Sequence, residues 1–219
     1  CIAAAGIESG KGNFSYTCTG GCEIVDRTFK CHKRDGHGLM TLESGLANSC
    51  NTYFYNFAFL IGGEKLYNTA SALGFGRATD RCDGLSASAG SMPKRESLSN
   101  IAYLANFSIG QGELLTSPVS MLNLYCAVAS DGAYNEPSAV EGTVKDGSYT
   151  PYKNGGRTRV MKKETAERIR KYLLSVIEEG SPKYTVVVFS ENISEQSETC
   201  GEVFAKIADG ITELEKTGE

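Results

Sequence analysis

Apolar residues recur at helical spacing through the first third of the chain. The Ala-rich start, "CIAAAGIES", has the composition of the second half of a helix, which Gly10 and Gly12 would end. Beyond it, apolar positions three and four residues apart predict further helices before the Gly-Phe-Gly turn at 74–76. The helices predicted in this region are 1–9, 41–48, 51–61 and 64–73. We expect these short helices to pack at angles around a shared core.

Two stretches lack this spacing. Residues 10–38 are rich in Gly, Cys and charged residues, which predicts a loop or a small hairpin held together by its cysteines. Residues 77–97 are polar and rich in Gly and Ser, and they are predicted to form a loop.

The second half of the chain predicts both helices and strands. A helix should begin at Ser117-Pro118 and stop at 131–132, because a serine cap precedes a proline in the first turn. Residues 133–158 are expected to be loop or short strand, and 159–180 to be an amphipathic helix. The core face of the Ser117 helix is expected to carry Val119, Leu122, Tyr125, Cys126 and Ala129.

The C-terminal part predicts one firm strand, "KYTVVVFS" at 183–190, and an amphipathic helix at 200–215. Weaker strand candidates lie near 140–152. Because a stable sheet needs several strands, further strands must come from residues outside this sequence or from another chain. The pattern therefore predicts an α+β domain that is incomplete as written.

Composition excludes some classes of function. The net charge is −4, and no cluster of Lys and Arg appears that could bind phosphates, so a nucleic-acid partner is not expected. No apolar run reaches the roughly 20 residues needed to cross a bilayer. Cys1 is neither an initiator Met nor part of a signal peptide, so residue 1 is not expected to be the native start.

Two quoted segments carry a resemblance to a known family. "GHGLMTLESGLANSCNTYFYNFAFLIGGEKLYNTASALGFG", followed by "FSIGQGELLTSPVSMLNLYCAVASDGAY", resembles the transpeptidase domain of class B penicillin-binding proteins. The likeness covers most of residues 1–135 and resumes at "SPKYTVVVFSEN". It implies the penicillin-binding and β-lactamase-like fold, a helix-rich subdomain packed with an antiparallel sheet flanked by helices.

The family works with three motifs, Ser-x-x-Lys, Ser-x-Asn and Lys-Thr-Gly. The resemblance assigns Ser-x-Asn to Ser49-Cys50-Asn51, with Ser49 relaying a proton and Asn51 holding a carbonyl of the substrate. The helix that follows would anchor this triplet through Phe54, Phe57 and Leu60. The alternative is helix capping, for which Ser and Asn are the commonest residues. Gly110 and Gln111 are candidate substrate contacts, with a plain loop as the alternative.

The other two motifs are expected in segments that the sequence does not contain. In the family, Ser-x-x-Lys comes immediately before the Ala-rich helix, and the Lys-Thr-Gly strand would fall between 181 and 182. Ser91-Met92-Pro93-Lys94 spells the first motif, but Pro93 opposes the helix that this motif needs. Lys216-Thr217-Gly218 spells the third at the C-terminus, where residues fray.

Cysteines are unusually frequent, with eight in 219 residues. Cys18, Cys22, Cys31 and His37 are spaced like zinc ligands, and His32 lies among them. A disulfide between Cys18 and Cys31 and simple free thiols remain alternatives.

The resemblance implies a peptidoglycan D,D-transpeptidase that cross-links stem peptides through an acyl-serine and is the target of β-lactams. No cofactor is required for such catalysis, and a structural Zn²⁺ is possible. Expected partners are stem peptides, β-lactams and other cell-wall synthesis proteins. The expected place is the extracytoplasmic face of the bacterial membrane, anchored by a segment outside this sequence. The alternatives are a catalytically inactive scaffold and a β-lactam sensor or β-lactamase relative.

Overall fold

The computed structural model of the chain describes residues 1–77, 79–82, 85–136, 142–151 and 156–174, with backbone alone for 79–82 and 85–87. The chain divides into two compact units, Cys1–Pro182 and Lys183–Glu219, and every described residue belongs to the first. The strand predicted at 183–190, the helix predicted at 200–215, the 181–182 junction and the motif at 216–218 lie outside the described residues.

The helices follow the predicted pattern with two exceptions: the helix predicted to start at 159 begins at Lys163, after Arg159 in a strand, and two elements before Ser117 were not predicted. The predictions for 1–9, 41–48, 51–61, 64–73 and the Ser117 start are confirmed. The segment before Ser117 also holds a helix and a short 3-10 turn that were not predicted. The described helices are α1 (Ile2–Glu8), α2 (Leu42–Ala47), α3 (Asn51–Ile61), α4 (Gly63–Ala72), η1 (Arg95–Ser99), α5 (Ile101–Ser108), α6 (Pro118–Ala129) and α7 (Lys163–Leu174).

The described strands pair two by two, all antiparallel. The hairpin predicted within 10–38 and the strands near 140–152 are confirmed, whereas the loop predicted over 77–97 contains a hairpin. The pairs are β1 (Tyr16–Cys18) with β4 (Gly38–Met40), β2 (Gly21–Ile24) with β3 (Arg27–Lys30), β5 (Thr79–Cys82) with β6 (Leu85–Ala87), β7 (Ala133–Asn135) with β10 (Arg157–Arg159), and β8 (Gly142–Lys145) with β9 (Ser148–Pro151).

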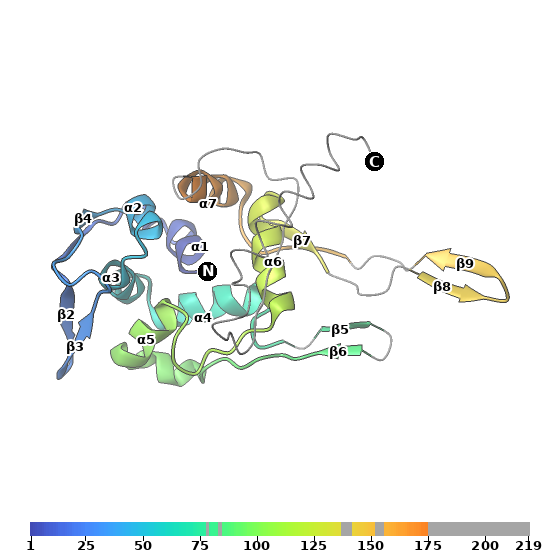
Figure 1. The fold of residues 1–219 in the computed structure, drawn as a ribbon, viewed down its shortest axis with the longest axis horizontal. Helices are drawn as coiled ribbons and strands as arrows, with labels where there is room; N and C mark the ends of the chain where they lie inside the picture. Colours follow the sequence, from blue (N-terminus) through green and yellow to red (C-terminus); the bar gives the residue numbers. More distant parts are fainter. Residues whose placement is uncertain (78, 83–84, 137–141, 152–155, 175–219) are drawn as a thin grey trace, which may run out of the picture. The chain divides into compact units, whose positions relative to one another are not determined.

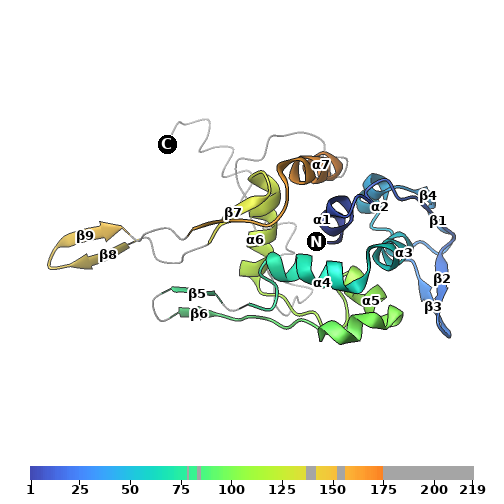
Figure 2. The ribbon, with the colours of Figure 1, turned by 180° about the vertical axis from the view of Figure 1, so that it is seen from behind.

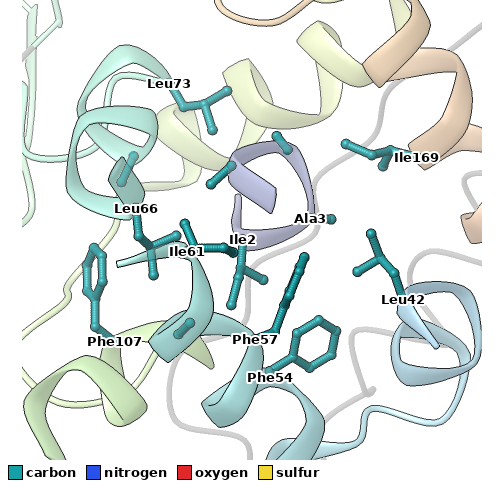
Figure 3. Packing of buried hydrophobic residues seen from close by; sticks show 14 of the residues in the cluster. Ile2, Ala3, Leu42, Phe54, Phe57, Ile61, Leu66, Leu73, Phe107 and Ile169 are labelled. Carbon is teal, nitrogen blue, oxygen red and sulfur yellow. The ribbon is translucent and has the colours of Figure 1, made fainter. Parts of the chain in front are cut away.

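Helix α3 lies at the centre of the core, against α1 and α5 (Figure 1, Figure 2). Its apolar face is buried with side chains from α1, α2, α4, α5 and α7 (Figure 3). Phe57 is fully buried against α1, where a methyl group at Gly6 would lie 2.0 Å from its ring. The predicted anchors Phe54 and Phe57 are confirmed, but Leu60 is 42% exposed and Ile61 is buried in its place.

The core face predicted for α6 is wrong: the buried positions are shifted by about one residue along the helix from the predicted ones. Tyr125 is 45% exposed, and the buried positions are Ser120, Asn123, Ala127 and Val128. The reason is that this face packs closely on backbone. The Ser120 hydroxyl donates a hydrogen bond to the Gly74 carbonyl at 3.4 Å, and the Asn123 side chain lies beside Gly74. Small and polar side chains permit this approach, so hydrophobic spacing alone misplaced the face.

Glu8 joins the two ends of the described chain. Its Oε1 accepts hydrogen bonds from the Lys162 N–H, at 2.8 Å, and from the Thr165 hydroxyl, so that α1 is tied to the start of α7. Burial raises the pKa of the Glu8 carboxyl, but these two hydrogen bonds outweigh that effect and the pKa lies below its ordinary value.

Replacing Glu8 with Ala is therefore expected to lower the free energy of unfolding by about 1–3 kcal/mol, because two donors lose their acceptor. The pH dependence has a definite sign. A depressed carboxyl pKa contributes stability above about pH 4.3, and this contribution disappears as the pH falls through the lowered folded value. Denaturant unfolding at pH 7 and pH 3 checks both statements. Glu96→Ala, at an exposed glutamate of η1, is the control. Equal losses in the two variants would contradict this role.

Candidate active site and cysteine cluster

The Ser49-Cys50-Asn51 triplet forms the turn between α2 and α3. Ser49 has φ +47°, a left-handed conformation that is uncommon for residues other than glycine and costs of order 1–3 kcal/mol. Backbone bonds define the turn, since the Ser49 N–H donates to the Leu46 carbonyl at 3.2 Å and the Cys50 N–H to the Gly45 carbonyl at 3.0 Å. Such strain persists only where surrounding contacts hold it.

Neither Ser49 nor Asn51 caps the helix that follows. The N-cap of α3 is Cys50, whose side chain makes no capping hydrogen bond. Ser49 is exposed and Asn51 half-buried, and within the described part of the chain neither side chain makes a hydrogen bond. Thus the capping alternative is wrong, and both polar groups are available to a ligand.

Cys50 anchors the turn in the protein interior. Its side chain is fully buried, and its Sγ lies 3.6 Å from the Thr52 hydroxyl, also fully buried in the first turn of α3. In the triplet, the buried Cys50 sulfur therefore lies between two more accessible polar side chains, those of Ser49 and Asn51.

That sulfur belongs to a cluster of four potential metal ligands. The Sγ atoms of Cys18, Cys31 and Cys50 and a ring nitrogen of His37 all lie within 4.8 Å of one another. His37 Nδ1 is 3.5 Å from both the Cys18 and the Cys31 sulfur. The cluster joins the end of β1, the residue after β3, the 32–37 loop and the Ser49 turn.

Cys22, predicted from spacing as a ligand, is not in this group. It lies in β2 opposite Phe29, and both residues pack with Ile24 against Tyr55. Alternation along the strand turns the Cys22 side chain to that face. Cys50 is the fourth member in its place.

The pKa values of the Cys18 and Cys50 thiols are shifted in opposite directions. Burial would raise the pKa of the Cys18 thiol, but bonds from the Thr52 hydroxyl, the Gly20 N–H and His37 lower it to about 6. For Cys50, burial dominates and raises the pKa. Cys18 is thus prepared as a thiolate, whereas Cys50 would lose its proton only to a metal or a strong base.

The donor set fits zinc. Three sulfurs and one imidazole are a common tetrahedral set for structural Zn²⁺, and Zn–S bonds of about 2.3 Å place ligand atoms roughly 3.5–4 Å apart. The two distances from His37 Nδ1 to sulfur, 3.5 Å each, match this spacing, and all the ligand atoms lie within 4.8 Å of one another. All its cysteines are free thiols in the structure.

Gly110 and Gln111 follow the end of α5 and are distant in sequence from the cysteine cluster. The Gln111 N–H donates to the Asn106 carbonyl at 2.9 Å, and Gly110 has φ +74°. Gln111 lines a cavity of about 370 Å³ between α5 and the β2–β3 hairpin, a cavity that neither Ser49 nor Asn51 lines. Their role as substrate contacts stays a prediction.

The Ser91–Lys94 stretch is not helical, as expected. Ser91 pairs with Leu115 in an isolated antiparallel bridge, and Lys94 has extended backbone angles. It therefore cannot place its serine and lysine on one helix face.

Sequence reasoning missed Thr52 and the role of Cys50. Cys50 is not among the ligands predicted from spacing, although its place between Ser49 and Asn51, after a cysteine-rich loop, was the available signal. It also missed α5, whose start was marked by Asn100. The Asn100 side chain caps the helix by accepting from the Ala102 N–H at 2.9 Å.

Comparison with known proteins gives a consistent result. Residues 1–192 match the family model described as the penicillin binding protein transpeptidase domain. The chain is 27% identical over 190 residues to stage V sporulation protein D of Bacillus subtilis, covering 84% of this chain and 29% of that protein. It is 31% identical over 152 residues to penicillin-binding protein PbpB of Mycobacterium tuberculosis, covering 68% and 22% respectively.

A solved structure shows the same fold. Penicillin binding protein 3 from Mycobacterium tuberculosis, complexed with aztreonam, superposes with a TM-score of 0.69 at 27% identity, covering 82% of this chain and 40% of that one. The α+β transpeptidase fold expected from the resemblance is confirmed. The chain spans less than a third of the length of the two curated relatives. Among its described residues, no helix has the length and apolar character needed to cross a membrane.

Proposed function

Because the chain belongs to the penicillin-binding protein transpeptidase domain family, we propose that it is part of a serine D,D-transpeptidase that cross-links peptidoglycan stem peptides. The observation that carries the proposal is the Ser49 turn. A strained residue with an exposed hydroxyl, fixed by a buried neighbour, is typical of a catalytic position. Relatives named peptidoglycan D,D-transpeptidases support the reaction class.

In this reaction a serine hydroxyl attacks the penultimate D-Ala carbonyl of a stem peptide, the terminal D-Ala leaves as an amine, and an acyl-serine ester forms. An amine of a second stem then attacks the ester, and the serine is restored. The nucleophile is expected in the Ser-x-x-Lys segment ahead of residue 1, and the Lys-Thr-Gly strand between 181 and 182. Both expectations follow from the order of motifs in the family.

Ser49 and Asn51 have separate roles in this proposal. The Ser49 hydroxyl both donates and accepts, so it can carry the proton from the nucleophile to the departing amine. The Asn51 carboxamide would bind a backbone carbonyl of the stem peptide without a charge to desolvate. Their freedom from other hydrogen bonds in the described residues suits both roles.

The proposal includes a structural Zn²⁺ held by Cys18, Cys31, Cys50 and His37. Its support is the donor set and the mutual distances within 4.8 Å. When bound, zinc would supply cross-linking and charge neutralisation, with no part in acyl transfer. The chain's own residues would position the hydroxyl, since ligation of Cys50 would fix the turn that presents Ser49.

The test is covalent capture of a β-lactam by the full-length protein. Incubation with a labelled penicillin should increase the intact mass by one β-lactam, and peptide mapping should place it on the serine of Ser-x-x-Lys. β-Lactam binding is supported by the aztreonam complex of the tuberculosis relative. Folded protein that gains no mass would instead support the inactive scaffold, and rapid loss of the label would support a β-lactamase relative.

Cellular context follows the same proposal. The protein would act at the extracytoplasmic face of the bacterial membrane, anchored outside the sequence described, with stem peptides, β-lactams and other cell-wall synthesis proteins as partners.

A further inference from the structure

The turn of the β2–β3 hairpin contains a strained valine. Ile24 pairs with Arg27 in the hairpin register, so Val25 and Asp26 form a two-residue turn. Val25 has φ +60°, whereas the φ of Asp26 is not positive. A positive φ at the first turn residue alone is the pattern of a type II′ turn, in which glycine normally takes that position. For a β-branched residue this backbone conformation is a genuine outlier.

Burial does not explain the choice of valine at this position. Val25 is 73% exposed, so its side chain gains little from the hydrophobic effect while its backbone is strained. The chain has favoured residues in another two-residue turn, since Asp146 and Gly147 of the β8–β9 hairpin both have positive φ, as an Asp-Gly type I′ turn requires. Strain and exposure at one apolar residue indicate a function for the Val25 side chain.

Val25 is one of the residues that line the cavity of about 370 Å³ between this hairpin and α5. The floor of the cavity is apolar and buried, and it is formed by Ile24, Pro93 and Phe107. Tyr103 also lines the cavity and is 48% exposed. The cavity thus joins a buried apolar floor to two exposed apolar side chains, which is the arrangement found at the centre of protein–protein interfaces.

The charged residues of the lining favour a basic group on the partner. Asp26, Arg27 and Glu113 all line the cavity. The side chains of Asp26 and Arg27 lie 4.0 Å apart and partly neutralise each other. Within the described residues, the Glu113 carboxylate makes no hydrogen bond or ion pair. It therefore leaves one unpaired negative charge beside an apolar cavity, and a Lys or Arg side chain would pair with it.

The exposure of the apolar side chains favours a protein over a small molecule. Small-molecule sites enclose most of the ligand surface in a concave pocket. Val25 and Tyr103 instead present apolar surface to solvent, and a second protein surface would cover it. At the centre of such interfaces, a large side chain of one protein commonly fills a pocket of the other.

We infer that this cavity docks a segment of another protein, which inserts one large apolar side chain against the buried floor and places a basic side chain beside Glu113. Val25, from the hairpin, and Tyr103, from α5, pack against the inserted residue. The inference is independent of the proposed function, because none of the lining residues belongs to the Ser49 turn or to the cysteine cluster.

The first measurement tests the strain by thermal unfolding of the full-length protein. Val25→Gly is expected to raise the Tm by about 2–4 °C, because glycine takes a positive φ without strain. Val144→Gly is the matched control. Val144 is 72% exposed but lies in β8 without a positive φ, so its replacement relieves no strain and should not raise the Tm. A Tm of Val25→Gly at or below that of wild type would assign the valine to the fold and overturn the inference.

The second measurement identifies the occupant of the cavity. A photoreactive phenylalanine analogue replaces Val25 in one full-length protein and Tyr103 in another, and cross-links formed in intact cells are mapped by mass spectrometry. Docking predicts that both positions capture the same segment of one partner protein, close to a large apolar residue and a Lys or Arg. The analogue at Val144 or Tyr125, two exposed residues outside the cavity, should not capture this segment.

A synthetic peptide of the mapped segment then measures the contribution of each residue to binding. Tyr103→Ala is expected to raise the Kd of this peptide about 30-fold or more, and Val25→Gly about 10-fold. Glu113→Gln should raise it about 2- to 5-fold. Tyr125→Ala and Val144→Gly should leave it unchanged. Val25→Gly is thus expected to weaken binding while it stabilises the protein, a combination that a purely structural role would not produce.

Three results would overturn the docking site. Cross-links from both positions to this chain itself would identify an interface between two copies, and the absence of any protein cross-link from Val25 and Tyr103 would leave only a small-ligand pocket. Equal peptide affinity in all variants would separate the captured segment from the cavity. β-Lactam acylation of Val25→Gly and Tyr103→Ala should stay within about 2-fold of wild type. If the wild-type protein is not acylated, the proposed function fails, whereas the docking measurements keep their meaning.

Discussion

Ser49→Gly is expected to lower the rate of β-lactam acylation by about 10²–10⁴-fold without lowering stability. The kinetic loss follows from the proposed proton relay, because removal of a positioned acid–base group costs about this much. The stability statement follows from the backbone. At φ +47° glycine is under less strain than serine, so unfolding should be unchanged or harder, by up to about 1 kcal/mol. The measurement is intact-mass kinetics beside thermal unfolding.

The first control separates the effect of losing the hydroxyl from the effect of relieving the backbone strain. Ser49→Ala loses the same hydroxyl but keeps the strained conformation, so its acylation should fall as far while its stability does not rise. Ser99→Ala removes an exposed hydroxyl from η1, which donates only to the Glu96 carbonyl, and should change neither quantity. Acylation of Ser49→Gly at the wild-type rate would exclude Ser49 from the chemistry.

Regular spacing explains what the sequence could predict. Helix α3 was predicted at 51–61 and is observed at Asn51–Ile61, because buried aromatics recur along it and Gly62 follows. The start of α6 was equally clear, since Ser117 caps it by accepting from the Ser120 N–H. Helix α5 has only eight residues within a polar region, so its spacing was too short to stand out.

What could not be predicted depends on contacts distant in the chain. Spacing placed Cys22 with Cys18 and Cys31, but strand alternation turns Cys22 toward Tyr55. Cys50, 32 residues after Cys18, completes the cluster only because the Ser49 turn folds back over the loop. Likewise, the buried face of α6 follows from a close approach to Gly74 that no hydrophobic pattern shows.

The Ser49 turn and the cysteine cluster share one residue, Cys50, and are therefore structurally coupled. Ser49 has an exposed hydroxyl in a strained conformation, and the next residue is a fully buried sulfur among three other ligand atoms. The Thr52 hydroxyl links the same sulfur to the first turn of α3. Whatever fixes this sulfur therefore also restrains the backbone turn that presents the Ser49 hydroxyl.

Removing zinc from the full-length protein is expected to lower both stability and acylation. If free zinc exceeds its Kd about a thousandfold, binding adds about 4 kcal/mol, which for a domain of this size is a Tm change of roughly 8–16 °C. Acylation should fall by up to about 100-fold, because a displacement of about 1 Å at a reacting group has that effect. Protein purified without chelator should contain one zinc per chain, measured by mass spectrometry of the metal before and after a strong chelator.

Serine substitutions decide which cysteines hold the metal. Cys50→Ser keeps the size of the side chain and removes a thiolate, so it should lose zinc and reproduce the chelated protein. Cys22→Ser should keep zinc, because Cys22 lies on the Tyr55 face of the hairpin. Cys126→Ser, at a half-buried cysteine in α6, is the neutral control. Zinc lost from Cys22→Ser but retained in Cys50→Ser would restore the set predicted from spacing, and it would separate the metal from the Ser49 turn.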